Sequence, residues 1–140
     1  MAATPKHSVS VAGIVIRDDG RVLVIKRDDN GHWEAPGGVL ELDESFEAGV
    51  QREVLEETGI TVTVERLTGA YKNLTHGIVA LVYRCRPAGG EPHATEEARE
   101  IRWMTKEEVQ SAMVPAFGVR VLDAFEESPQ SRSHDGVNVV

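Results

Sequence analysis

The 140-residue chain has one cysteine and no apolar run near the roughly 20 residues that a membrane-spanning helix requires. A single cysteine excludes an internal disulfide framework. Cys85 ends the apolar run IVALVYRC and is interpreted as a buried strand residue, the alternative being a reactive thiol. The first residues, MAATPKHSV, lack the apolar core of a secretory signal. These absences predict a cytoplasmic protein.

Positive charge is also scarce. Lys and Arg number 15 against 23 Asp and Glu, so the formal net charge is −8 at pH 7. Nucleic-acid backbones and anionic membranes are bound by clustered basic side chains, so neither is an expected partner. A small molecule that carries phosphate is compatible with this charge if a metal ion bridges the two.

Length and composition favour one domain, because 140 residues that are 41% apolar form a single sizeable core. We place that domain at residues 1–127. Residues 128–140, SPQSRSHDGVNVV, have the composition of a C-terminal tail. Contact with a neighbouring chain, as in a homodimer, is one way in which such a tail could be held.

Hydrophobic periodicity and turn residues predict the elements. Strands are expected at residues 8–16, 21–27, 61–67, 77–85 and 100–104. A helix capped by Asp43 is expected to run to about Thr58 and to stop at Gly59, and residues 87–97 read as a surface loop. Further helices are expected after the capping box at residues 105–108 and at residues 116–126. The prediction is a mixed β-sheet sandwiched between α-helices, an α/β or α+β fold.

The first predicted helix concentrates negative charge. At about 100° per residue, Glu53, Glu56 and Glu57 fall on one face, where they repel one another. Carboxylate oxygens on one helical turn suit Mg²⁺ or Mn²⁺, which would relieve that repulsion. A solvated helix that keeps the protein soluble is the alternative. Arg52 lies two turns from Glu44, on nearly the same side, so its fork is expected to bind that carboxylate.

The order of residues around these acids is specific. The chain resembles the Nudix hydrolase family, MutT-like members in particular, through a complete Nudix box at residues 38–60, carried by Gly38, Glu44, Arg52, Glu53, Val54, Glu56, Glu57, Gly59 and Ile60. The resemblance implies a Nudix fold and Mg²⁺- or Mn²⁺-dependent hydrolysis of a nucleoside diphosphate linked to another group. It also implies that the three glutamates of the acidic face ligate metal, assisted by the carbonyl of Gly37.

Catalytic roles are implied in the same way. Glu53 or Glu56 would orient or deprotonate the attacking water, with Glu53 preferred, while Arg52 and Glu44 would belong to the catalytic segment. Some Nudix relatives recruit a further acid from a distant loop. Glu97 is the first choice for that metal ligand and Glu100 the second.

Substrate contacts are less well defined by the sequence. Lys26 and Arg27 end a strand and can meet phosphate oxygens, while Trp33 and Tyr71 can stack on a base, although aromatic residues more often lie in a core. His32 and His76 have no evident partner and carry little weight.

No second signature selects a subclass, since residues 61–86 contain no proline of the kind seen in ADP-ribose hydrolases and Tyr71 comes too early for a dinucleoside polyphosphate hydrolase. We therefore expect a nucleoside triphosphate pyrophosphohydrolase. An ADP-ribose or nucleotide-sugar pyrophosphatase and a non-hydrolysing nucleotide sensor remain as alternatives.

Overall fold

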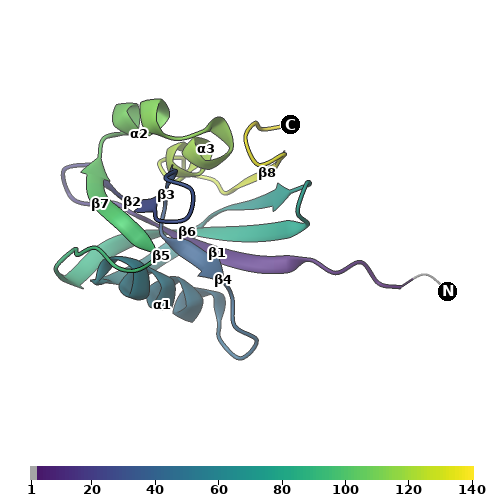
Figure 1. Cartoon of the computed structure of the whole chain (residues 1–140), viewed down its shortest axis with the longest axis horizontal. Helices are drawn as coiled ribbons and strands as arrows, with labels where there is room; N and C mark the ends of the chain where they lie inside the picture. The colour runs from purple at the N-terminus through teal and green to yellow at the C-terminus, as the bar shows by residue number, and fades with distance from the viewer. Residues whose placement is uncertain (1–2) are drawn as a thin grey trace.

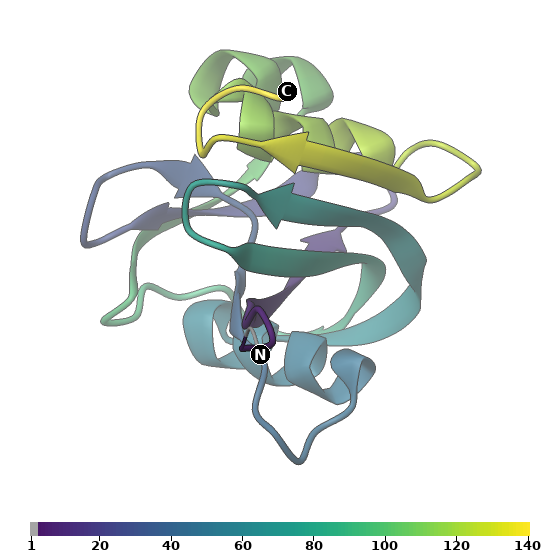
Figure 2. The same cartoon turned by 90° about the vertical axis from the view of Figure 1, so that its right-hand side faces the viewer.

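Two β-sheets lie between helices on opposite sides in the computed structural model, which describes residues 3–140 (Figure 1). The strands are β1 (Ser8–Val15), β2 (Val22–Arg27), β3 (Trp33–Glu34), β4 (Gly37–Val39), β5 (Ile60–Asn73), β6 (Ile78–Gly90), β7 (Ala98–Met104) and β8 (Gln130–His134). The helices are α1 (Phe46–Thr58), α2 (Lys106–Ala112) and α3 (Pro115–Asp123). α1 covers one side of the sheets, and α2 and α3 cover the other (Figures 1 and 2).

The larger sheet is mixed, as predicted. Its strand order is β4-β1-β6-β5-β8, and the smaller sheet has the order β3-β2-β7. β1 runs parallel to β6 and β5 runs parallel to β8, whereas the other pairs are antiparallel. An isolated bridge between Ile16 and Val22 links the two sheets where β1 turns into β2.

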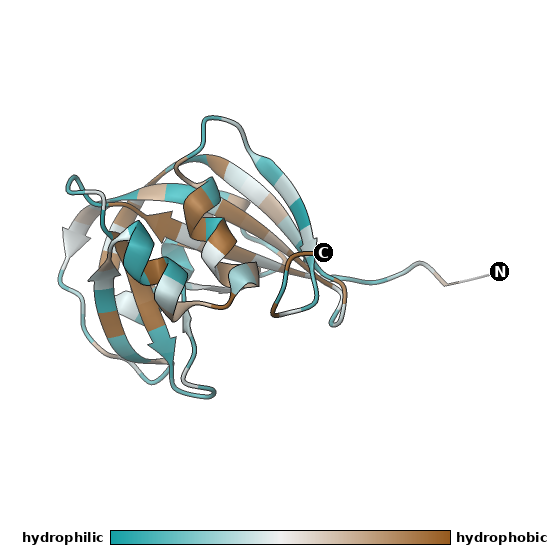
Figure 3. Ribbon diagram, turned by 90° about the horizontal axis from the view of Figure 1, so that it is seen from above, coloured by the Kyte–Doolittle hydropathy of each residue, from teal (hydrophilic) through white to brown (hydrophobic). Residues whose placement is uncertain are grey.

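The core has two halves because side chains alternate along β1. Val11 and Val15 pack in the cluster that faces α1, and Ile14 and Ile16 pack in the cluster that faces α2 and α3. Figure 3 shows this apolar material concentrated in the central strands and in α3. A strand that is apolar on both faces is therefore explained by helices on both sides of the sheet.

Two local predictions need correction. Ser45, not Asp43, caps α1: its backbone is extended and its hydroxyl accepts a hydrogen bond from the Ala48 N–H at 3.1 Å. The first part of the loop predicted at residues 87–97 instead continues β6 to Gly90. Pairing with β5, which begins at Ile60 immediately after the helix, overrides the Pro and Gly composition of that segment.

The predicted C-terminal tail joins the fold. Residues 130–134 form β8 along β5, with Asn73 opposite His134 (Figure 2). The Arg132 guanidinium donates to both oxygens of Asp123, at 2.8 and 2.9 Å, which ties β8 to the end of α3. The protein's own sheet thus holds the segment, whereas the homodimer and the domain boundary at residue 127 stay predictions. None of the helices within residues 3–140 is long and apolar enough to cross a membrane.

Candidate active site

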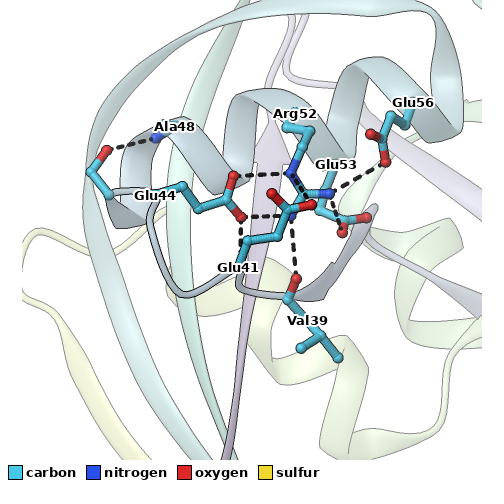
Figure 4. A network of polar contacts seen from close by, with 8 residues as sticks. Val39, Glu41, Glu44, Ala48, Arg52, Glu53 and Glu56 are labelled. Carbon is cyan, nitrogen blue, oxygen red and sulfur yellow. Dashed lines mark hydrogen bonds and ion pairs between the residues drawn. The ribbon is translucent and has the colours of Figure 1, made fainter.

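The entry to α1 is fastened by Arg52, as the sequence predicted. Its Nε and Nη2 donate to the two oxygens of Glu44 at 2.9 and 2.6 Å, and Nη2 also donates to the Val39 carbonyl at 3.2 Å (Figure 4). This bidentate pair fixes the turn between β4 and α1. The Arg52 guanidinium and the Glu41 N–H lower the pKa of Glu44 to about 2.

Three carboxylates converge beside this helix. Glu53 and Glu57, on successive turns of α1, and Glu97, from the loop before β7, each offer an oxygen within 4.8 Å of the others. Glu53 is 8% exposed and Glu57 is 4% exposed. Burial, together with the neighbouring Glu53 carboxylate, raises the pKa of Glu57 to about 9. Three carboxylates this close together, two of them buried, repel one another strongly. A bound proton or a bound cation is needed to neutralise part of their negative charge.

Glycine makes the approach of β4 to these acids possible. A Cβ on Gly38 would lie 2.7 Å from the Glu53 carboxyl, so any side chain at that position would displace it. The Gly37 N–H donates to Glu57 at 3.4 Å. Metal binding by the Gly37 carbonyl stays a prediction.

The loop that carries Glu97 docks on the carboxyl end of α1. The His93 N–H donates to the Thr58 carbonyl at 3.0 Å, and the His93 ring lies against Gly59, where a Cβ would come within 2.3 Å of it. Gly59 has a φ of 80°, the left-handed cap predicted for this position. The helix end and the loop are therefore built as one unit.

Two other predicted acids lie elsewhere. Glu56 is on the outer side of α1, with its side chain 57% exposed and one oxygen 3.3 Å from Arg52 Nη1, and it is not in the group formed by Glu53, Glu57 and Glu97 (Figure 4). Glu100 accepts a hydrogen bond from Arg102 at 3.0 Å on β7. The structure thus brings Glu97, and not Glu100, to Glu53 and Glu57, while metal binding by Glu56 stays a prediction.

Two adjoining cavities open over these residues. One, the acidic cavity, measures about 580 Å³ and is lined by Glu53, Glu57, Glu96, Glu97, Asp28 and Asp29 among others. The second, the Arg120 cavity, measures about 290 Å³ and lies between the larger sheet and α3. Ser10, Arg27, Gly37 and Gly38 line both, so a ligand can extend from one into the other.

The acidic cavity fits a hard divalent cation. Its donors are carboxylate oxygens, the ligands that Mg²⁺ and Mn²⁺ prefer, and Gly38 leaves the space that Glu53 needs to approach. A cation bound there would neutralise repelling acids and polarise a phosphoryl group.

Comparison with known proteins decides the family. The model of the NUDIX domain matches residues 6–125. The chain belongs to the Nudix family. A MutT-like protein from Streptomyces ambofaciens is 56% identical over 137 residues, which are 97% of this chain and 89% of that protein. An ADP-ribose pyrophosphatase from Methanocaldococcus jannaschii is 35% identical over 100 residues, 66% of this chain and 59% of that protein.

The fold is confirmed by the crystal structure of a NUDIX hydrolase from Nitrosomonas europaea, similar with a TM-score of 0.80 at 20% identity over 94% of this chain and 82% of the other. The predicted enzyme class, a Nudix pyrophosphohydrolase, is confirmed by the family. Nudix hydrolases act on nucleoside diphosphate-linked substrates and generally use divalent metals.

The predicted substrate residues of this Nudix enzyme separate into two groups. Arg27 lines both cavities and is held by Asp29 at 2.8 Å and Glu34 at 2.9 Å. Lys26, the next residue on β2, lies with its Nζ 5.8 Å from the Trp33 ring centroid, and neither is among the described residues that line the two cavities. Their predicted substrate contacts gain no support from the structure.

Tyr71 requires a clearer correction. It is 1% exposed in the core, where its hydroxyl donates to Asp123 at 2.7 Å. A residue so enclosed cannot stack on a base, because the apolar cluster against α3 already covers its ring.

Cys85 is also fully buried, and burial raises the pKa of its thiol to about 12, which confirms that it is a buried strand residue and not a reactive thiol.

The two histidines considered earlier lie outside both cavities in the described part of the chain. His32 is exposed beside Trp33, and His76 is exposed in the turn between β5 and β6. Sequence reasoning missed a different set, namely Asn73, Phe117, Arg120 and His134, which line the Arg120 cavity. Phe117 could have been found from the sequence, because it lies on the last predicted helix. His134 had none, because its segment reads as a tail.

Proposed function

We propose that this Nudix hydrolase cleaves a pyrophosphate bond of nucleoside triphosphates, releasing a nucleoside monophosphate and pyrophosphate. The observation that carries the proposal is the junction of the two cavities at Arg27. The acidic cavity suits a polyphosphate with its metal, and the Arg120 cavity is a mostly apolar space large enough to hold a base. Arg27 can contact the phosphate that connects them.

Glu53, Glu57 and Glu97 would hold Mg²⁺ or Mn²⁺, with the Gly37 carbonyl as a further ligand. The metal would supply charge neutralisation for the polyphosphate and its transition state. Glu53 also lines the acidic cavity, where it can orient the attacking water, whereas Glu56 is turned toward Arg52 and solvent. Because Glu53 lies in the acidic cavity and Glu56 does not, we assign the role of orienting the water to Glu53.

A second candidate substrate is ADP-ribose, on the strength of the relative from Methanocaldococcus jannaschii that bears that name. The experiment is a comparison of kcat/KM for nucleoside triphosphates, ADP-ribose and nucleotide sugars with Mg²⁺ and with Mn²⁺. Triphosphates are expected to lead, with pyrophosphate as a product. A preference for ADP-ribose or a nucleotide sugar would overturn the proposal, and absence of any turnover would leave the sensor alternative.

A further inference from the structure

Arg120 on α3 stands in an unusual environment for a charged side chain. Its guanidinium carbon lies 5.0 Å from the Tyr71 ring centroid and 4.6 Å from the Phe117 ring centroid. Aromatic rings next to the guanidinium favour contact with its flat faces, which leaves its N–H edges for hydrogen bonding. Nε is buried with no hydrogen-bond partner among residues 3–140, and Nη2 lies 3.1 Å from His134 Nε2.

His134 cannot fully satisfy this donor. A neutral imidazole offers one acceptor nitrogen and one N–H. The Gly136 N–H already points at His134 Nδ1 from 3.0 Å, so the ring hydrogen belongs on Nε2, where it faces Arg120. If the ring hydrogen is on Nδ1 instead, Nε2 can accept from Arg120, but the Gly136 N–H then faces another donor. In either state the group formed by Arg120, His134 and Gly136 has more donors than acceptors.

The rest of the Arg120 cavity does not correct the excess. Glu34 is the one carboxylate among its described lining residues, and it accepts a hydrogen bond from Arg27 at 2.9 Å. Arg27 is thus paired with Glu34 and also with Asp29 outside this cavity, whereas no described carboxylate of the lining accepts a hydrogen bond from Arg120. The remaining lining is largely apolar, with Ala12 and Ala80 on the floor of the sheet. A fitting ligand is flat, apolar on its faces and rich in acceptors along one edge.

We propose that Arg120, held against the rings of Tyr71 and Phe117, is a specificity-determining residue that donates to the carbonyl oxygen of a 6-oxopurine base. The proposal deepens the proposed function and rests on it for the placement of the polyphosphate. A 6-aminopurine presents an amino group at the same position, and two donors would then face each other without compensation. Arginine paired with an oxygen and ring nitrogen of a purine is a recognised selective contact.

The test compares inosine and adenosine nucleotides, which carry a 6-oxo and a 6-amino group on the same purine framework. We expect kcat/KM for inosine triphosphate to exceed that for adenosine triphosphate by about tenfold or more. In Arg120→Met the ratio should fall toward one, while Arg120→Lys should restore it only in part because its ammonium lacks the planar fork. Arg86→Met removes an exposed arginine of β6 and should keep the parent ratio.

Equilibrium binding of inosine and adenosine monophosphates to the parent protein, measured by calorimetry, supplies a readout that needs neither turnover nor a mutant that folds. Equal affinity for the two, or a higher affinity for the adenosine form, would overturn the inference even if triphosphates are hydrolysed. An equal decrease in kcat/KM for both triphosphates in Arg120→Met would also overturn the inference, because Arg120 would then contact a phosphate and not the base. Failure of all triphosphates as substrates, with inosine monophosphate still preferred, would instead refute the proposed function alone.

Discussion

The Thr95 hydroxyl donates a hydrogen bond to the backbone carbonyl of Glu57 at 3.1 Å. It also accepts one from the Ala98 N–H at 3.2 Å, so Thr95 connects the last turn of α1 to the loop that carries Glu97. α1 has no basic residue in its last turn, and this loop instead donates hydrogen bonds to two of its terminal carbonyls, those of Glu57 and Thr58. Thr95 thereby sets the position of Glu97 relative to Glu57.

Replacing Thr95 should weaken metal binding. Thr95→Val keeps the shape of the side chain but removes the hydrogen bond, and we expect the Kd for Mn²⁺ to rise about tenfold, as for other residues that orient metal ligands. Thr95→Ser should recover most of the affinity. Thr63→Val, on an exposed position of β5, is the matched control. An unchanged Mn²⁺ affinity by titration calorimetry would contradict the positioning role.

Glu57→Gln should separate activity from folding. The loss of one charge from the group of three acids should reduce kcat at saturating Mg²⁺ by about 100-fold or more. The Tm in the absence of metal should not fall, because the pKa of Glu57 is already raised by burial and by Glu53. Glu107→Gln, exposed on α2, is the control. Parent-like turnover in Glu57→Gln would refute the assigned site.

Metal binding should depend on pH in a defined direction. With its pKa raised to about 9, Glu57 carries a proton near neutral pH in the metal-free protein. A cation must displace that proton, so the affinity for Mn²⁺ should increase as pH rises toward about 9. Calorimetry in buffers of different ionisation enthalpy should detect the released proton. Affinity that stays constant over this range, or binding without proton release, would contradict the expectation.

Arg52→Ala should lower the Tm by about 5 °C near neutral pH as well as reduce activity, because it releases the turn before α1. The pKa of Glu44 is lower in the folded protein than its ordinary value of 4.5. Such a carboxylate stabilises the folded protein at pH values above 4.5, and this stabilisation is lost as the pH falls toward about 2. Melting curves of parent and variant should therefore converge in acid. A constant difference in Tm would show that the ion pair is not the cause.

Arg132→Ala should show how strongly β8 belongs to the fold. Asp123 is 3% exposed and would lose both hydrogen bonds from Arg132, keeping only the Tyr71 hydroxyl. We expect the free energy of unfolding in urea to fall by about 3 kcal/mol. The double variant Asp123→Asn with Arg132→Met should recover part of the loss, because no charge is then left buried. Unaltered stability of the single variant would contradict an integral role for β8.

The sequence predicted the parts of the site that depend on local spacing. Glu53 and Glu57 could be placed together because both lie on one helix, and Arg52 could be paired with Glu44 from helical geometry alone. Glu97 could be suggested only from the resemblance, because the loop that brings it to α1 is fixed by backbone contacts that leave no pattern in the residue types.

Long-range packing explains the misses. Tyr71 stands on β5 beyond the strand predicted at residues 61–67, and the burial of its face depends on α3 and on Asp123, far along the chain. His134 lies in a polar strand, QSRSH, which has no alternation of apolar residues because it sits at the edge of the sheet. Such a strand is stabilised by its partner β5, and single-sequence periodicity cannot detect it.

The position of β8 in the chain has a consequence for biosynthesis. β8 follows every other strand and helix, and it closes a long loop when it aligns with β5. The three carboxylates come from segments that leave the ribosome earlier. Until β8 is made, the residues of the acidic cavity are already present, whereas the Arg120 cavity still lacks the wall that His134 supplies.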